Sequence, residues 1–241
     1  MTFRVFLAVE GVNDGGALGQ SPQARANDPS NEGALQPLVR RILEDEIEIR
    51  GQKTTMLRLS HLTDPAHATG RRVRQASVLA ALDGCDVLVM HADVDATEPL
   101  GDAAGARTTV AQLIDEGFAV AERGGGGVPQ DRAIACVPCR TIEAWLLADH
   151  EALRAAADDD NVTAERAVAD PEALWGDNAA GTDHPKHVLR RALRPRDPRA
   201  ATRDYRRLAE SADLDRIESA CPVSFAPFRR ALLAAKAATG S

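Results

Sequence analysis

Aromatic residues are scarce in this chain, at 3% of the sequence. Hydrophobic residues as a whole reach 44% and charged residues 27%, which is the balance of a globular protein. The core must therefore be built mainly from Leu, Val, Ile and Ala. The 241 residues suffice for one large domain, or for one domain with an appended subdomain.

Long apolar runs are also absent: none approaches the roughly 20 residues that a helix needs to cross a bilayer. The N-terminus shows no basic segment followed by an apolar stretch and a small-residue cleavage site, which a secretory leader would have. The sequence therefore predicts no membrane association and no export, and we expect a cytoplasmic protein.

Cysteine is limited to four residues. Cys136 and Cys139 have C-x-x-C spacing, and His184 and His187 follow later, so a zinc ion held by two thiolates and two imidazoles is one alternative. A single C-x-x-C is a weak signal, and Cys136 falls within an apolar run. We favour buried, reduced cysteines without a catalytic role.

Basic residues are outnumbered, with 29 Lys and Arg against 36 Asp and Glu and a formal net charge of -7. Such a protein does not attract nucleic acid over long distances. Two basic runs, 71–74 and 190–199, could still grip phosphate groups locally. The alternative is that each run forms the solvated face of a helix.

Apolar runs alternate with helical patterns over the first 157 residues. Strands are predicted at 3–9, 55–62, 86–90 and 133–137, and helices from near Gly33 and at 69–83, 107–123 and 141–157. Strands separated by helices indicate an α/β fold with a mainly parallel sheet. A long polar connection, 11–32, interrupts the unit.

Strand signals stop after residue 157. Short helices are predicted at 171–175, 184–193, 203–220 and 225–238. The sequence therefore predicts an α/β domain over 1–157 and a helical C-terminal subdomain over 158–241, packed against the sheet.

Acidic residues follow two of the predicted strands. Glu10 ends the first, with Asp14 four residues beyond it; His91, Asp93 and Asp95 follow the third. Residues past the carboxyl ends of parallel strands line the crevice where ligands bind, and gathered carboxylates favour Mg²⁺ or Mn²⁺. Such a site suits phosphoryl transfer. The alternative is that these residues end strands because turns favour polar side chains.

Glu143 lies within the apolar arc of the predicted helix 141–157. A carboxylate in that position is costly unless it is paired, bound to a metal or facing a cavity. Arg140 is a candidate partner. A role in the site and a structural ion pair therefore both remain open.

Three segments resemble one family: Val9-Glu10-Gly11, Asp93-Val94-Asp95 and the stretch from Thr141 to Asp149, whose most specific piece reads Glu-Ala-Trp-Leu-Leu-Ala-Asp. The family is a bacterial TOPRIM-like family of unknown function, number four-two-seven-six in the domain-of-unknown-function series. His184-Pro185-Lys186 and Cys221–Phe225 resemble its C-terminal half, which adds Lys186 to the auxiliary candidates.

The resemblance implies a TOPRIM-like sheet, as in topoisomerases, primases and overcoming-lysogenization-defect nucleases. In those proteins a glutamate and an Asp-x-Asp bind Mg²⁺ for phosphodiester chemistry. Carried over, Glu10 is the general acid/base or a metal ligand, Asp93 and Asp95 are metal ligands, and Asp14 is auxiliary. The chain departs from the family where residues 11–32 replace an early helix. Relatives are often linked to phage defence.

The leading hypothesis is therefore a Mg²⁺- or Mn²⁺-dependent nuclease (a hydrolase) or related phosphodiester-transfer enzyme, with nucleic acid as its partner. A second hypothesis is a non-catalytic TOPRIM-like scaffold that binds a partner ATPase. The third is the zinc-binding module described above.

Overall fold

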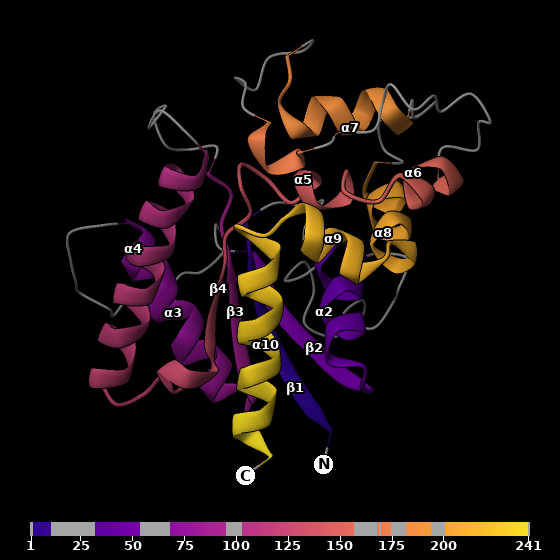
Figure 1. The fold of residues 1–241 in the computed structure, drawn as a ribbon. Coiled ribbons are helices and arrows are strands. Elements are labelled where there is room, and N and C mark those ends of the chain that lie inside the picture. The colour runs from indigo at the N-terminus through magenta and orange to yellow at the C-terminus, as the bar shows by residue number, and fades with distance from the viewer. Residues whose placement is uncertain are drawn as a thin grey trace.

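The computed structural model describes residues 2–10, 32–53, 68–94, 103–156, 168, 170–174, 182–193 and 201–240. Within them, four parallel strands form one sheet in the order β2-β1-β3-β4 (Figure 1). The strands are β1 (Phe3–Val9), β2 (Ile47–Lys53), β3 (Val87–His91) and β4 (Ala133–Cys136). The predicted α/β fold with a mainly parallel sheet is confirmed.

Helices cover both faces of the sheet and the carboxyl ends of its strands (Figure 1). One face carries α2 (Leu35–Leu43), α8 (Ala201–Ser211), α9 (Leu214–Ala220) and α10 (Phe225–Thr239), and the other carries α3 (Ala68–Leu82) and α4 (Ala103–Arg123). At the carboxyl ends lie α5 (Glu143–Leu146), α6 (His150–Ala156) and α7 (Pro185–Leu193). Two single turns of 3₁₀-helix, η4 (Gln130–Arg132) and η6 (Pro171–Ala173), complete the described elements.

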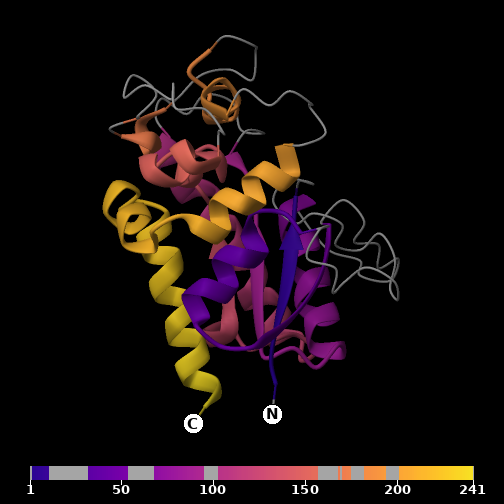
Figure 2. The same cartoon turned by 90° about the vertical axis from the view of Figure 1, so that its right-hand side faces the viewer.

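Alternation along the strands divides the core into two clusters. In β3, Val87 and Val89 pack with α2 and α10, whereas Leu88 and Met90 pack with α3 and α4. The first cluster also includes Leu208 of α8, so the C-terminal helices share one apolar core with the sheet. Figure 2 shows α10 running along the sheet toward the amino ends of the strands.

Most of the predicted elements are confirmed. The helix near Gly33 is α2, and its apolar residues Leu35, Leu38, Val39, Ile42 and Leu43 are buried. The predicted helix 69–83 is α3, followed by Gly84 with a φ of 63° that glycine adopts without strain. No helix within the described ranges is both long and apolar enough to cross a membrane.

Strand β2 was not predicted, and the predicted strand 55–62 lies outside the described residues. The strand was missed because its apolar alternation is limited to Ile47 and Ile49, and the glycine and polar residues that follow are uncommon in strands. Gly51 pairs with Leu7, and a Cβ at that glycine would lie 2.1 Å from the Leu7 carbonyl oxygen. Glycine therefore permits the close approach of β1 and β2.

Two segments that were predicted as single continuous helices are each divided into two helices. The predicted helix 141–157 is two helices, α5 and α6, and the predicted helix 203–220 is also two, α8 and α9. In both cases an aspartate begins the second helix: Asp149 precedes α6, and Asp213 caps α9 by accepting hydrogen bonds from Asp215 N and Arg216 N. Because a capping aspartate satisfies the free N–H groups of a new helix, it marks a break that apolar spacing does not reveal.

Candidate metal and phosphate site

The candidate site lies where the sheet reverses its strand order. From β1 the chain continues to α2 on one face and then to β2, whereas from β3 it continues to α4 on the opposite face and then to β4. The two strands β1 and β3 are neighbours. In open parallel sheets, ligands bind at such a switch point, past the carboxyl ends of the strands.

Glu10 and Asp93 come together at this point. Glu10 follows β1 directly, and its Oε2 accepts a hydrogen bond of 3.1 Å from the backbone N–H of Asp93, two residues past β3. His91, the last residue of β3, is fully buried, and its Nε2 lies 3.4 Å from Oδ1 of Asp93. We call Glu10, His91 and Asp93 the carboxylate edge.

Asp14 and Asp95 lie outside the described residues, so their placement near the carboxylate edge stays a prediction. Within the described ranges, no group of three or more His, Cys, Asp or Glu side chains is placed to hold a metal ion. The carboxylate edge by itself is therefore not a complete protein cage for a cation.

The segment after β4 runs beside the carboxylate edge and contains a strained residue. The backbone N–H of Val94 donates to the carbonyl of Arg140 over 2.9 Å. Arg140 has a φ of 71°, a left-handed conformation that costs a non-glycine residue about 1–3 kcal/mol. Such backbone strain is typical of functional segments, and no feature of the sequence predicted it.

The strained residue and two of the residues that follow it have buried polar side chains. Arg140 is 7% exposed, Thr141 0% and Glu143 1%, and the hydroxyl of Thr141 makes no hydrogen bond with a described residue. Glu143 opens α5, in the first turn of that helix. The pairing of Arg140 with Glu143 and the role of Glu143 in a site both stay predictions.

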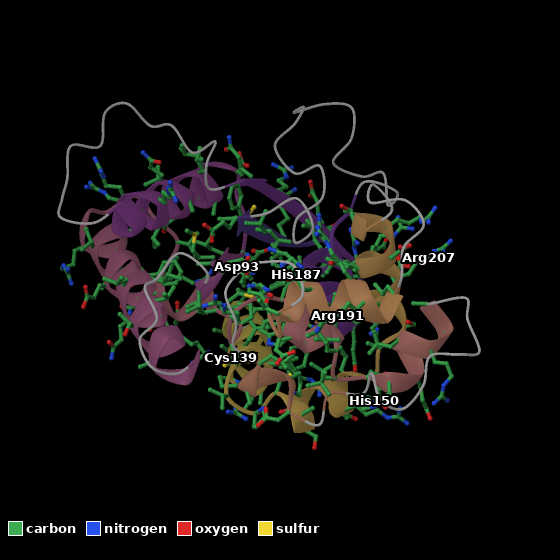
Figure 3. The ribbon with its side chains drawn as sticks, turned by 90° about the horizontal axis from the view of Figure 1, so that it is seen from above. Asp93, Cys139, His150, His187, Arg191 and Arg207 are labelled. Carbon is green, nitrogen blue, oxygen red and sulfur yellow. The ribbon has the colours of Figure 1, made fainter. Side chains whose placement is uncertain are left out.

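Helix α7 lies at the same end of the molecule (Figure 3). Its first turn contains Lys186, whose N–H donates to Nδ1 of the buried His184 over 3.2 Å. The rings of His184 and His187 contact each other with their centroids 5.8 Å apart. Lys186 is partly buried and belongs to the helix that covers the carboxyl ends of the strands.

The proposed zinc ligands are not gathered. All four of them, Cys136, Cys139, His184 and His187, lie among the described residues, where no such metal-binding group occurs. Cys139 is 1% exposed, and its burial, together with the charge of Glu172, raises the pKa of its thiol to about 12. The zinc-binding module therefore has no assembled set of ligands among the described side chains.

Several residues of the family-like segments join the sheet to the C-terminal helices. Trp145 is fully buried, its indole N–H donates to Oγ of Ser224 over 2.7 Å, and its ring lies against Phe225 and Phe228. Glu172, buried in η6, accepts hydrogen bonds from the backbone N–H and the hydroxyl of Ser224 at the start of α10.

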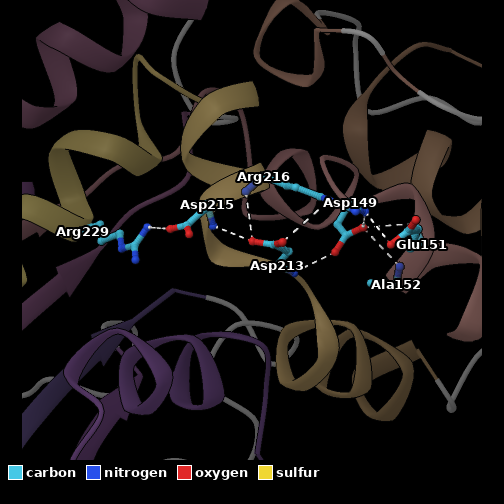
Figure 4. A network of polar contacts seen from close by, with 7 residues as sticks. All are labelled: Asp149, Glu151, Ala152, Asp213, Asp215, Arg216 and Arg229. Atoms are coloured by element: carbon cyan, nitrogen blue, oxygen red, sulfur yellow. Dashed lines mark hydrogen bonds and ion pairs between the residues drawn. The ribbon is translucent and has the colours of Figure 1, made fainter.

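Asp149 makes the second connection. Its carboxylate accepts hydrogen bonds from the backbone N–H groups of Glu151, Ala152 and Asp213, the last over 2.7 Å, and one from the Arg216 guanidinium over 3.2 Å (Figure 4).

We call these five residues the helical joint: Trp145, Asp149, Glu172, Asp213 and Ser224. The structural roles of Glu172 and Asp213 were missed. Glu172 binds residues 223 and 224, which are far from it in the sequence, and Asp213 lies within the apolar pattern that predicted one continuous helix.

A cavity of about 630 Å³ lies on the α2 and α9 side, away from the carboxylate edge. It is lined by Arg41, Glu44, Asp213, Leu214, Asp215 and Arg229. Its charges are largely compensated within the protein: Arg229 pairs with Asp215 over 2.6 Å, and Arg41 donates to the Ala209 carbonyl. This cavity contains none of the predicted site residues.

Comparison with known proteins gives one match. The model of a family described as a domain of unknown function, DUF4276, matches residues 27–233. No curated protein and no solved structure matches the chain. The match covers the helical joint, Asp93 and α7, whereas Glu10 precedes it.

Proposed function

We propose that this chain, which belongs to the DUF4276 family of domains of unknown function, is a divalent-metal-dependent nuclease or a related phosphodiester-transfer enzyme. The observation that supports it is the 3.1 Å hydrogen bond from Asp93 N to Glu10 Oε2 at the switch point of the sheet. Two residues far apart in the sequence thereby bring carboxylates to the position where open parallel sheets bind ligands.

The donor set fits Mg²⁺ or Mn²⁺. Both ions prefer oxygen ligands, and Mg²⁺ commonly takes only one or two protein carboxylates, with water and substrate phosphate completing its shell. Glu10 and Asp93 would supply two carboxylates, and Asp95 would supply a third. A bound ion would neutralise charge on the phosphate and lower the pKa of a water molecule.

Each residue of the carboxylate edge has a role in this proposal. Asp93 would be a metal ligand, and His91, 3.4 Å from its Oδ1, would orient that carboxylate. Glu10 would bind the metal or transfer the proton, with Lys186 and Glu143 as auxiliary groups. The relation to TOPRIM nucleases and a part in phage defence belong to the same proposal and rest on the resemblance.

Calorimetric titration of metal-free protein with Mn²⁺ tests the proposal. The natural protein is compared with the double variant Glu10→Gln/Asp93→Asn and with a matched control, Glu116→Gln/Asp131→Asn, which removes two exposed carboxylates elsewhere. We expect binding by the natural protein and the control, and none by the site variant. A cleavage screen on DNA and RNA with the same three proteins then tests the activity.

A non-catalytic scaffold that binds a partner ATPase is the second candidate. The observation that favours it is the lack of a three-residue metal group among the described side chains. It predicts that no metal binds, that neither DNA nor RNA is cut with any divalent metal, and that partner binding survives the Glu10→Gln/Asp93→Asn substitutions. Those results together would reject the hypothesis that the protein is a metal-dependent enzyme.

A further inference from the structure

Positive charge is concentrated in one part of this acidic protein. Residues 186–207 contain nine Lys and Arg side chains and two Asp, a net charge of +7 within a chain whose total is -7. The described portion of this segment consists of most of α7 and α8. Residues 194–200 between them lie outside the described residues; without them the segment still has six Lys and Arg side chains and one Asp, a net charge of +5.

The two helices turn their arginines toward solvent. Helix α7 buries Leu189, Ala192 and Leu193 and exposes Arg190 and Arg191. Helix α8 buries Tyr205, Leu208 and Ala209 and exposes Arg203 and Arg207. The buried faces of α7 and α8 pack against α5 and α6, so the two helices that contain the exposed arginines are held in place by the rest of the protein.

These charges are compensated only in part. Arg191 donates to the Thr182 carbonyl over 2.7 Å and lies 3.6 Å from the exposed Asp183, and Arg203 lies 3.4 Å from its neighbour Asp204. Arg190 and Arg207 form no ion pair with a described residue. Exposed pairs of this kind contribute little, so a polyanion can compete for these arginines.

The arginines lie at the same end of the molecule as the carboxylate edge. The view onto the carboxyl ends of the strands shows Asp93, with Arg191 on α7 and Arg207 on α8 (Figure 3). A polymer bound along these helices would therefore pass over the end of the sheet that contains Glu10 and Asp93.

The composition of the surface indicates which polyanion it fits. Arginine binds phosphate through a planar fork of donors, and arginine dominates here. These two helices contain no Phe or Trp, and their one Tyr, Tyr205, is fully buried and cannot stack on a base. The large exposed apolar residues of the described chain, Leu82, Val223 and Leu233, all lie on other elements, so α7 and α8 have no apolar face for a membrane.

We infer that Arg190, Arg191, Arg203 and Arg207 form a surface that binds the phosphate backbone of a duplex nucleic acid. The inference rests on the proposed function for the choice of a nucleic acid among polyanions. It extends that function by assigning the substrate surface to α7 and α8, and it predicts binding without sequence preference.

Fluorescence anisotropy with a labelled 30-base-pair duplex tests the inference, in EDTA and over a series of salt concentrations. The variant Arg190→Ala/Arg207→Ala removes the two arginines that have no ion pair in the described structure. The matched control, Arg123→Ala/Arg230→Ala, removes two exposed arginines from α4 and α10. Circular dichroism checks that each variant is folded.

We expect the natural protein and the control to bind the duplex. The Arg190→Ala/Arg207→Ala variant should bind roughly tenfold more weakly, and the slope of log K against log salt should fall by about two. Because EDTA removes the metal, this result is independent of the metal titration, and either experiment can fail alone.

Four results would overturn the inference. The natural protein could fail to bind the duplex at low salt, or both double variants could lose affinity equally, which would indicate net charge alone. Tighter binding of a single strand than of the duplex would contradict a surface without stacking residues. Displacement of the duplex by phosphatidylserine vesicles, with the same dependence on Arg190 and Arg207, would assign the surface to lipid.

Discussion

The helical joint and the carboxylate edge both bring acidic side chains together, but they differ in how many hydrogen bonds the protein donates to each carboxylate. At the joint, the Asp149 carboxylate accepts hydrogen bonds from three backbone N–H groups and from the Arg216 guanidinium. At the edge, Glu10 accepts one hydrogen bond from within the described residues, from the backbone of Asp93.

This difference separates carboxylates that hold the fold together from those that can bind a ligand. A carboxylate has about four lone-pair sites, and at Asp149 the protein fills them. Glu10 keeps most of its acceptor capacity for groups other than the described residues, at the point where the sheet reverses its strand order. The comparison therefore predicts large stability effects at the joint and small ones at the edge.

Trp145→Ala should give the largest loss of stability. The substitution empties the space between Phe225 and Phe228 and leaves the Ser224 hydroxyl without its indole donor. Replacing a fully buried Trp by Ala costs about 3–5 kcal/mol of unfolding free energy. Urea unfolding followed by circular dichroism measures it.

Leu82→Ala is the control for this prediction, because Leu82 is 75% exposed and should change the unfolding free energy by less than about 0.5 kcal/mol. Equal stabilities of the natural protein and Trp145→Ala would show that the joint does not hold the C-terminal helices to the sheet.

The sequence was sufficient to predict the helices and strands that bury a single apolar stripe. Leu35 and Leu38 belong to a helical spacing that has one explanation, a helix face against a core, and α2 follows it. Strand β2 could not be found in the same way, since its apolar pattern is limited to Ile47 and Ile49 and its pairing partner, β1, is far away in the sequence.

The candidate site was predictable only in outline. That Glu10 and Asp93 could meet followed from two apolar runs ending in acids, but their meeting depends on β1 and β3 being neighbours, which the strand order alone establishes. The left-handed backbone of Arg140 and the hydrogen bonds of Glu172 depend on tertiary contacts, and no local residue pattern encodes them.

Asp149→Asn should produce an intermediate, pH-dependent loss. Burial raises the pKa of the Asp149 carboxyl, but the N–H groups of Asp213, Ala152 and Glu151 and the Arg216 guanidinium lower it below its ordinary value of 3.8. The ionised carboxylate therefore stabilises the fold above pH 3.8, and this contribution is lost as the pH falls through the lowered pKa. At pH 7 we expect a loss of about 1–3 kcal/mol.

Urea unfolding at a series of pH values from 7 to 3 measures this effect, and the difference between the natural protein and Asp149→Asn should shrink at the acid end. Asp215→Asn is the matched control, because the Asp215 side chain is 85% exposed and its pair with Arg229 contributes little. A difference that stays constant down to pH 3 would mean that the charge of Asp149 is not what stabilises the joint.

Glu10→Gln should have the smallest effect on stability and so gives the sharpest test of the comparison. The amide oxygen of glutamine can still accept the hydrogen bond from Asp93 N, and the substitution removes one charge from an acidic edge. We therefore expect a change of less than about 0.5 kcal/mol without metal. With Mn²⁺ present, thermal unfolding of the natural protein should shift upward, because an ion bound only by the folded state stabilises it, and the variant should show a smaller shift. A large loss of stability in metal-free Glu10→Gln would place Glu10 among the structural carboxylates, beside Asp149, and would remove the distinction on which the candidate site depends.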